Sequence, residues 1–269
     1  MLLVPVAPGA QVRLRDEDAR LSEDLPKSEL NDRLRKLTDH MDELQSALHA
    51  ASKHAVLVVL QGRDAAGKDG TIRRVFGPLD PQGLVVTAFK APSAEELAHD
   101  YLWRVHRAVP ARGEIGLFNR SHYEDVLVVR VDQLVPESVW RPRYEQINLF
   151  ERLLIQNGVV ILKFFLHISR AEQRERLLAR LSDPAKYWKF DKGDLEKRRE
   201  WDAYTAAYEE MLGRTSTPEA PWYVVPADQK PVRNVAVAEI VVDALERLQP
   251  RYPGPPPELE ELRQMLTRE

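Results

Sequence analysis

The stretch VLVVLQGRDAAGKDGTIRRVF, Val56 to Phe76, starts as an apolar strand and ends as a helical run, with a glycine-bracketed loop between them. Gly62, Gly67 and Lys68 follow the spacing G-x-x-x-x-G-K, in which glycines let main-chain N–H groups turn inward and the lysine adds a positive charge. The following helix points its positive dipole end at the same place. The stretch therefore predicts a phosphate-binding loop; the alternative is a tight strand–helix turn with a solvated lysine.

Two acidic residues in this stretch bear on a metal. The Ser or Thr that usually follows the lysine and ligates Mg²⁺ is Asp69 here, so a metal must be held differently. Asp64, inside the loop, is the predicted substitute ligand. The residues expected to bind phosphate are Gly62, Ala65, Ala66, Gly67, Lys68, Asp69 and Gly70.

Short apolar strands alternate with helical stretches after the loop. This alternation predicts an α/β fold, a three-layer sandwich in which a parallel sheet of about five strands has helices on both faces. The expected strands are 56–60, 84–89, 115–118, 159–166 and 222–225, and the expected helices include 94–106, 143–157 and 232–248.

Length and composition indicate one domain with extensions. The 269 residues, 43% of them hydrophobic, suffice for a single α/β core. We expect an N-terminal arm at 1–27 that either wraps the domain or frays, a domain at 28–248, and a Pro-rich tail at 249–269 that ends in a short amphipathic helix. Residues 28–51 form a helix with one narrow apolar seam, which fits a coiled-coil dimer contact or, as we favour, a helix laid along its own domain.

Composition also narrows the function classes. The chain has no cysteine, so disulfides and thiolate metal sites are excluded. A net charge of −3 argues against a nucleic-acid surface. The absence of a signal peptide and of an apolar run of membrane-spanning length predicts no membrane partner and a cytoplasmic location.

Polar side chains follow the strand 115–118, at the edge of the sheet where ligands collect. Arg120 there can bridge two phosphate groups, and Glu124 or Asp125 can help to hold Mg²⁺. The ordinary alternative is an ion pair between Arg120 and Glu124 four residues on, and His122 is expected to be an ordinary core or surface side chain.

A third cluster spans residues 174–199 and holds nine Lys or Arg against five Asp or Glu. Much of it is expected to be a solvated face. Placed after the fourth strand, it also fits a mobile lid that brings cations down on phosphates. Phosphoryl transfer to a phosphate oxygen requires no general base, which suits a chain in which no Ser–His or Cys–His pair is evident.

Five stretches occur in a set order: VLQGRDAAGKDGTIRRVF, DYLWRVHRAVP, FNRSHYEDVLVVRV, ILKFFLHISRAEQRERL and WKFDKGDLEKRREWDAY. Together they resemble the polyphosphate kinase 2 family from about Ser28 to Leu248. The resemblance implies a phosphate-loop kinase fold like that of thymidylate kinase, with a helical lid at about 174–200. It also implies an enzyme that moves phosphate between inorganic polyphosphate and adenine nucleotides with Mg²⁺.

The resemblance assigns roles to particular residues. Asp64, Lys68 and Arg120 match the family's catalytic motifs, and Glu124-Asp125 resembles the subgroup that accepts both AMP and ADP. The lid cations expected to track polyphosphate are Arg176, Arg180, Lys189 and Arg199. Because family members are oligomeric, we expect a homo-oligomer, a dimer or tetramer.

Two other functions stay open at this point. An ATP-dependent nucleoside monophosphate kinase would share the fold and the loop. A nucleotide-gated binding module is disfavoured because the guanine-reading Asn-Lys-x-Asp signature is missing.

Overall fold

The computed structural model describes residues 3–21 and 25–268, and its described part contains a five-stranded sheet. The strands are β1 (Ala55–Gly62), β2 (Leu84–Ala88), β3 (Ile115–Asn119), β4 (Val159–His167) and β5 (Trp222–Pro226). They pair in the order β2-β3-β1-β4-β5, and every pair is parallel. The predicted parallel sheet is therefore confirmed, and β1, which carries the loop, lies at its centre.

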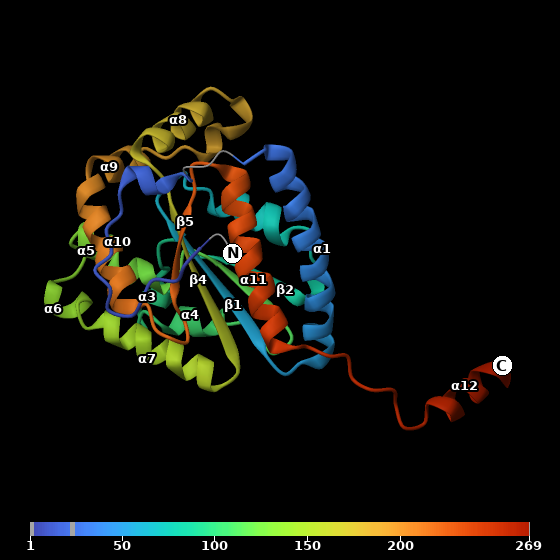
Figure 1. The fold of residues 1–269 in the computed structure, drawn as a ribbon. Helices are drawn as coiled ribbons and strands as arrows, with labels where there is room; N and C mark the ends of the chain where they lie inside the picture. The colour runs from blue at the N-terminus through green and yellow to red at the C-terminus, as the bar shows by residue number, and fades with distance from the viewer. Residues whose placement is uncertain (1–2, 22–24, 269) are drawn as a thin grey trace.

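Helices cover both faces of the sheet, which completes the predicted three-layer sandwich (Figure 1). Alternate residues of β1 point to opposite faces. Val58 packs in a core with α1 (Lys27–Ala51) and α11 (Lys230–Leu248), whereas Leu57 packs in a second core with α7 (Arg143–Gln156) and α10 (Trp201–Thr215). Burial on both faces explains why β1 reads as a continuous apolar run.

The long helix α1 lies beside α11 (Figure 1). All six residues of its apolar seam pack against the domain's own cores: Leu30, Leu34, Leu37, Met41, Leu44 and Leu48. The interpretation of this helix as part of its own domain is confirmed. A dimer contact through α1 would therefore have to use its other faces.

Two helical regions differ from expectation. The single helix predicted at 94–106 is two short ones, α3 (Ala94–Leu97) and α4 (Trp103–Arg107). Between them the Asp100 carboxylate accepts a hydrogen bond from the main-chain N–H of Leu102 at 3.0 Å, a local turn that competes with the helix. The second difference is α10, a helix that sequence reasoning did not assign.

The N-terminal arm wraps the domain along the exposed edge of β5. The Val6 N–H donates to the carbonyl of Trp222 at 2.8 Å, and Pro5 forms an isolated antiparallel bridge with Tyr223. The arm thereby covers a sheet edge that would otherwise present unpaired main-chain groups. Residues 1–2 and 22–24 of the predicted arm lie outside the described residues.

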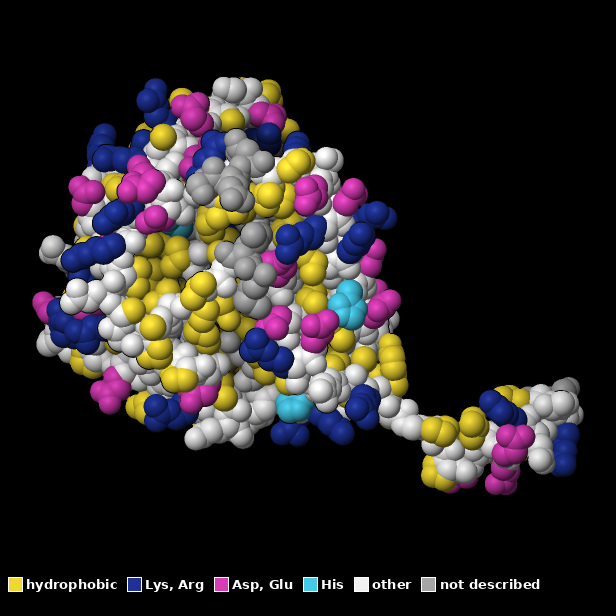
Figure 2. Space-filling model, in the orientation of Figure 1, with side chains coloured by type: hydrophobic (Ala, Val, Ile, Leu, Met, Phe, Trp, Pro, Cys, Tyr) yellow, Lys and Arg dark blue, Asp and Glu magenta, His cyan; other side chains and the backbone are white. Residues whose placement is uncertain are grey.

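The C-terminal tail leads to α12 (Leu259–Arg268), which stands away from the domain in Figures 1 and 2. On the face drawn in Figure 2, basic and acidic side chains are interspersed over the domain. Across residues 3–21 and 25–268, no helix is both long and apolar enough to span a bilayer.

Short helical elements occupy the connections. At the carboxyl end of the sheet lie α8 (Arg170–Leu181), η5 (Pro184–Lys189) and α9 (Gly193–Arg199). In Figure 1, α8 projects at the top, and α9 lies below it at the upper left. The remaining elements are η1 (Asp16–Ala19), α2 (Lys68–Thr71), η2 (Ile72–Phe76), η3 (Pro81–Gly83), η4 (His122–Val126), α5 (Val128–Val131) and α6 (Glu137–Trp140).

Candidate active site

The loop between β1 and α2 curls around the ammonium group of Lys68. This side chain is buried, and its Nζ donates to the carbonyl of Gly62 at 2.6 Å and to that of Arg63 at 3.3 Å. Gly67 has φ 109°, and a Cβ there would overlap the guanidinium of Arg233. Glycine is therefore favoured at 67 by its backbone conformation, and the Arg233 side chain fills the space where a Cβ would lie.

Arg120 meets this loop because β3 pairs with β1. The Arg120 N–H donates to the carbonyl of Leu60 at 3.1 Å, and its Nη2 donates to Asp64 Oδ1 at 2.7 Å. Arg120 has φ 61°, an uncommon conformation for a residue with a side chain. The structure thus brings Asp64, Lys68 and Arg120 together, and it pairs Arg120 with Asp64 rather than with Glu124.

A cavity of about 30 Å³ lies beside these groups. It is lined by the loop, Arg120, Glu124 and two tyrosines of α10, Tyr204 and Tyr208, and the 170–199 segment closes it with Gln173 and Lys197. The phosphate loop, the residues after β3, the helix α10 and the 170–199 segment therefore share one space.

The charges around the cavity shift each other's pKa values. Burial alone would raise the pKa of Asp64, but Lys68, Arg120 and Lys197 together lower it to about 2. Burial, with Arg120 nearby, lowers the pKa of Lys68 to about 8. Asp64 is thus a carboxylate throughout the physiological range, and Lys68 holds its proton less firmly than an ordinary lysine.

The acidic pair after β3 is split between two environments. Glu124 lines the cavity. The Asp125 carboxylate accepts a hydrogen bond from Arg143 Nη1 at 3.0 Å, and burial raises its pKa. Either residue was expected to support the metal, but of the two only Glu124 lines the cavity. The two residues are neighbours in η4, and Asp125 is directed to Arg143 instead.

A metal ion in this site would depend on few protein ligands. Within residues 3–21 and 25–268, no group of three His, Asp or Glu side chains is placed to hold a metal. Mg²⁺ is commonly bound by one or two carboxylates together with substrate phosphates and water. Asp64 and Glu124, which line one cavity, fit that mode.

Arg176 differs from its expected role as a polyphosphate contact. Its five N–H donors go to Glu172 (2.8 Å), to the loop carbonyls of Ala65 and Ala66 (3.0 Å each) and to two carbonyls just after β5 (2.6 and 2.9 Å). A guanidinium has five such donors, so none is left for a substrate in this conformation. Arg176 links the phosphate loop to the segment that follows β5.

The other predicted lid cations differ from one another in their partners. Arg180 donates to the carbonyl of Lys189 at 3.1 Å and to Asp194 at 3.2 Å, so it holds the segment together. Lys189 lies 3.8 Å from Asp69 Oδ2 and thus reaches the loop, as expected. Arg199 is exposed.

Lys197 reaches the loop where Arg199 does not. Its Nζ lies 3.5 Å from Asp64 Oδ2. Residues two apart on a helix point about 200° apart, so Lys197 and Arg199 cannot both face the loop. Sequence reasoning identified the basic cluster but could not assign the phase of α9.

Further residues of the site were missed. Tyr204 and Tyr208 come from α10, whose spacing of Trp201, Tyr204, Tyr208 and Met211 is the helical signal that was available. Arg63 stacks its guanidinium 3.7 Å from the ring centroid of Trp201.

Asp69 and Arg233 each make a hydrogen bond at the loop. Asn119 Nδ2 donates to Asp69 Oδ1 at 2.7 Å, and Arg233 Nη1 donates to the carbonyl of Ala66 at 3.3 Å. Burial and the neighbouring Arg176 lower the pKa of Arg233 to about 10. Arg233 carried no local motif that would have marked it as part of the site.

Comparisons with known proteins agree on one family. The family model for polyphosphate kinase 2 matches residues 24–253. An AMP/ADP-polyphosphate phosphotransferase of Meiothermus ruber is 56% identical over 219 residues, covering 81% of this chain and 82% of that protein. An ADP-polyphosphate phosphotransferase of Rhodopseudomonas palustris is 45% identical over 258 residues, covering 90% and 89%. The crystal structure of polyphosphate kinase 2 from Arthrobacter aurescens TC1 superposes with a TM-score of 0.88 at 38% identity, covering 99% of each chain.

Proposed function

The chain belongs to the polyphosphate kinase 2 family and is a phosphotransferase, and from this premise we propose that it transfers the terminal phosphate of polyphosphate to AMP and ADP, giving ADP and ATP. The observation that carries the proposal is the convergence of Asp64, Lys68 and Arg120 on one phosphate loop. The relatives are named as phosphotransferases for AMP, for ADP or for both, which supports the choice of acceptors.

Lys68 and Arg120 are proposed to stabilise the transferring phosphoryl group. Both are cations next to the loop, where fixed charges gain strength once water is expelled. The acceptor is a phosphate oxygen, which is already anionic, so no general base is assigned. These two side chains would then hold polyphosphate and the nucleotide with the reacting phosphate groups in line.

Mg²⁺ is the proposed cofactor, with Asp64 as its protein ligand and Glu124 in support. When bound, Mg²⁺ supplies charge that neutralises the phosphate oxygens. The low pKa of Asp64 keeps an oxygen ligand ionised for this purpose. The loop amides from Gly62 to Gly70 are proposed to bind the phosphates.

The 170–199 segment is proposed to act as a lid. The segment contributes Gln173 and Lys197 to the lining of the cavity beside the phosphate loop, so a movement of the segment would change access to that cavity. Lys197 now pairs with Asp64, and Lys189 pairs with Asp69. Both lysines would pair with phosphate groups of polyphosphate when the lid closes on it. Arg180 would keep the segment in one piece during that motion.

The test is a donor and acceptor assay on the purified protein. It is incubated with Mg²⁺, long-chain polyphosphate and, separately, AMP, ADP, GMP or GDP, and the products are separated. We expect ADP and ATP to form from AMP with polyphosphate as the sole donor. A protein that phosphorylates AMP from ATP but not from polyphosphate would overturn the proposal.

Assembly and location complete the proposal. A dimer or tetramer and a cytoplasmic location, both expected from the sequence, stay predictions. Sedimentation of the purified protein measures the first, and fractionation of cells that express it measures the second.

A further inference from the structure

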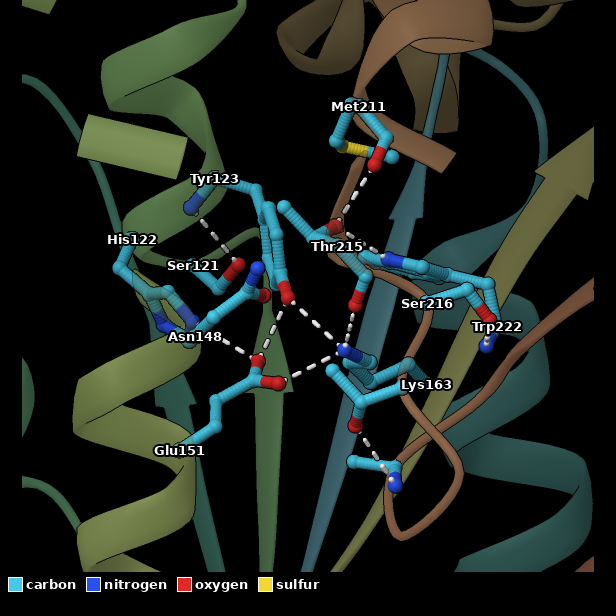
Figure 3. Close-up of polar contacts among 12 residues, drawn as sticks. Ser121, His122, Tyr123, Asn148, Glu151, Lys163, Met211, Thr215, Ser216 and Trp222 are labelled. Atoms are coloured by element: carbon cyan, nitrogen blue, oxygen red, sulfur yellow. Dashed lines mark hydrogen bonds and ion pairs between the residues drawn. The ribbon is translucent and has the colours of Figure 1, made fainter. Parts of the chain in front are cut away.

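A second charged cluster is buried behind the site, between β4 and α7 (Figure 3). Lys163 of β4 donates to Glu151 Oε2 at 2.7 Å, to the Tyr123 hydroxyl at 3.0 Å and to the carbonyl of Thr215 at 2.6 Å. Lys163 and Glu151 are almost wholly inaccessible to solvent. The ammonium group thus has a fixed acceptor for each of its three N–H donors.

The cluster holds the loop that follows β3. Glu151 Oε1 accepts from the Tyr123 hydroxyl at 2.6 Å and lies 3.3 Å from His122 Nε2. Figure 3 shows both loop side chains directed at this one carboxylate. His122 and Tyr123 lie between Arg120 and Glu124, which line the cavity. Residues of one short loop are therefore anchored in the core while their neighbours face the substrate site.

A second anchor ties the same loop to β1. The Tyr123 N–H donates to the Ser121 hydroxyl at 3.2 Å. In the orientation of the Gln61 amide that satisfies both of its ends, its oxygen accepts from the Ser121 N–H at 3.2 Å and its nitrogen donates to Glu124 Oε1 at 3.1 Å. The side chain of Glu124 is thus oriented by the strand that carries the phosphate loop.

Stability does not explain a buried ion pair at this place. Removing two charges from water costs more than their attraction usually returns, and well-packed apolar side chains often serve a core better. The surroundings are apolar, including Leu57, Phe165 and Trp222. Burial alone would raise the pKa of Glu151, but Lys163 and His122 hold it below its usual value, while burial lowers the pKa of Lys163.

The neighbouring backbone needs such an anchor. Arg120 adopts φ 61°, a conformation that persists only where the surroundings impose it. Hydrogen bonds to charged groups have defined directions, which apolar contacts lack. The anchored side chains of His122 and Tyr123, two and three residues after Arg120, limit the conformations that this backbone can take.

We propose that Tyr123, Glu151 and Lys163 are positioning residues that fix the loop after β3, and thereby Arg120, in the geometry required for phosphoryl transfer. They touch no substrate and act through Arg120. The inference rests on the proposed function, since it assigns a role within that site. A misplaced Arg120 would reduce turnover more than substrate binding.

Two variants separate positioning from stability. Tyr123→Phe removes the hydroxyl that links the loop to the ion pair. The triple variant Tyr123→Phe/Glu151→Leu/Lys163→Met replaces the cluster by apolar side chains. For both we expect kcat to fall about tenfold or more, with KM for polyphosphate within about twofold of the wild-type value. Melting temperature is measured alongside, and the triple variant is expected to stay folded.

Gln45→Leu is the matched control. Gln45 is also buried and hydrogen-bonded, donating to the carbonyl of Asp80 at 2.9 Å, but it lies in α1 on the other face of the sheet. It should lower the melting temperature and leave kcat unchanged. Loss of kcat in Gln45→Leu equal to that in Tyr123→Phe would overturn the proposal, because general destabilisation would then account for both.

A double-mutant cycle tests the route through Arg120. In an Arg120→Ala background, adding Tyr123→Phe should change kcat by less than about twofold, because the positioned group is gone. A full tenfold effect in that background, or normal kcat in Tyr123→Phe, contradicts the proposal. Failure of the proposed function would show differently, as absence of polyphosphate-dependent turnover in the wild-type protein.

Discussion

Two buried lysines, Lys163 and Lys68, have different kinds of partners. Lys163 is on β4 and Lys68 follows β1, the strand beside it. Lys163 gives its three donors to a carboxylate, a hydroxyl and a carbonyl, whereas Lys68 has two main-chain carbonyls as acceptors among the described residues. Arg120, another cation, is close enough to Lys68 to lower its pKa.

A structural cation and a cation available to a ligand differ in their partners. A structural ammonium is neutralised and fully hydrogen-bonded, as Lys163 is. Among the described residues Lys68 has acceptors for two of its three donors, and it lies near both Arg120 and the carboxylates of Asp64, Glu124 and Asp69 without a hydrogen bond to any of these carboxylates. The buried positive charge around the phosphate loop is therefore a feature that substrate phosphates would satisfy.

The largest expected effect is on stability, at Lys163. Lys163→Met leaves Glu151 charged and buried without its partner, and this should lower the free energy of unfolding by about 3–5 kcal/mol. Urea denaturation measures it. The matched variant Lys68→Met should change the same quantity by less than about 1 kcal/mol, since it removes a cation that has no carboxylate hydrogen-bonded to it. Equal losses of unfolding free energy in the two variants would contradict the difference between a structural lysine and a lysine available to a ligand.

The next effect is on turnover, at Lys68. Lys68→Met should reduce kcat more than a hundredfold, because one charge contact to the transition state is worth about 3 kcal/mol. The measurement is ADP formation from AMP and polyphosphate by a variant shown to be folded. Near-normal turnover would show that Lys68 does not contact the transferring group.

The pH dependence of kcat/KM tests whether the charge of Lys68 is required. Lys68 has a pKa of about 8 in the free protein. If its charge is required, kcat/KM should fall about tenfold per pH unit above about 8. Lys68→Arg, which keeps its charge, should lack this limb.

The same pKa shift affects stability with a defined sign. Between about 8 and the ordinary 10.5, the unfolded chain binds the Lys68 proton more tightly than the folded one. The contribution of this group to the free energy of unfolding therefore rises with pH across that window. Comparing wild type with Lys68→Met by urea denaturation at pH 7.5 and pH 10 isolates it, and a fall with pH would contradict the assignment.

The smallest effect concerns the lid cations. Lys197→Ala should raise KM for polyphosphate by about threefold to fivefold, the equivalent of roughly 1 kcal/mol for a partly exposed charge. Arg199→Ala is the control, because Arg199 is exposed on the same helix and should leave KM within about twofold. Initial rates at varied polyphosphate concentration measure both. A larger effect at Arg199 would mean that α9 turns when the lid closes.

Much of the fold could be predicted because the pattern of apolar residues along a segment matches the faces that the segment buries. The continuous apolar run of β1 indicated a strand that is buried on both faces. The apolar seam of α1 indicated a helix that is buried along one face. The helix α10 and the break at Asp100 were missed, since one lacked a clear start signal and the other depends on a single side-chain hydrogen bond. The loop residues Asp64 and Lys68 were found because phosphate binding needs a contiguous sequence pattern.

The sequence by itself determined the phosphate loop, the parallel sheet and the family, because each is written in neighbouring residues with fixed spacing. The tertiary structure alone decided which charges face the site: Glu124 rather than Asp125, Lys197 rather than Arg199, and Arg176 as a fastener. It also revealed the ion pair of Glu151 and Lys163, twelve residues apart on different elements. The physical reason is that side-chain direction and partner choice depend on helix phase and strand pairing, which no single segment encodes.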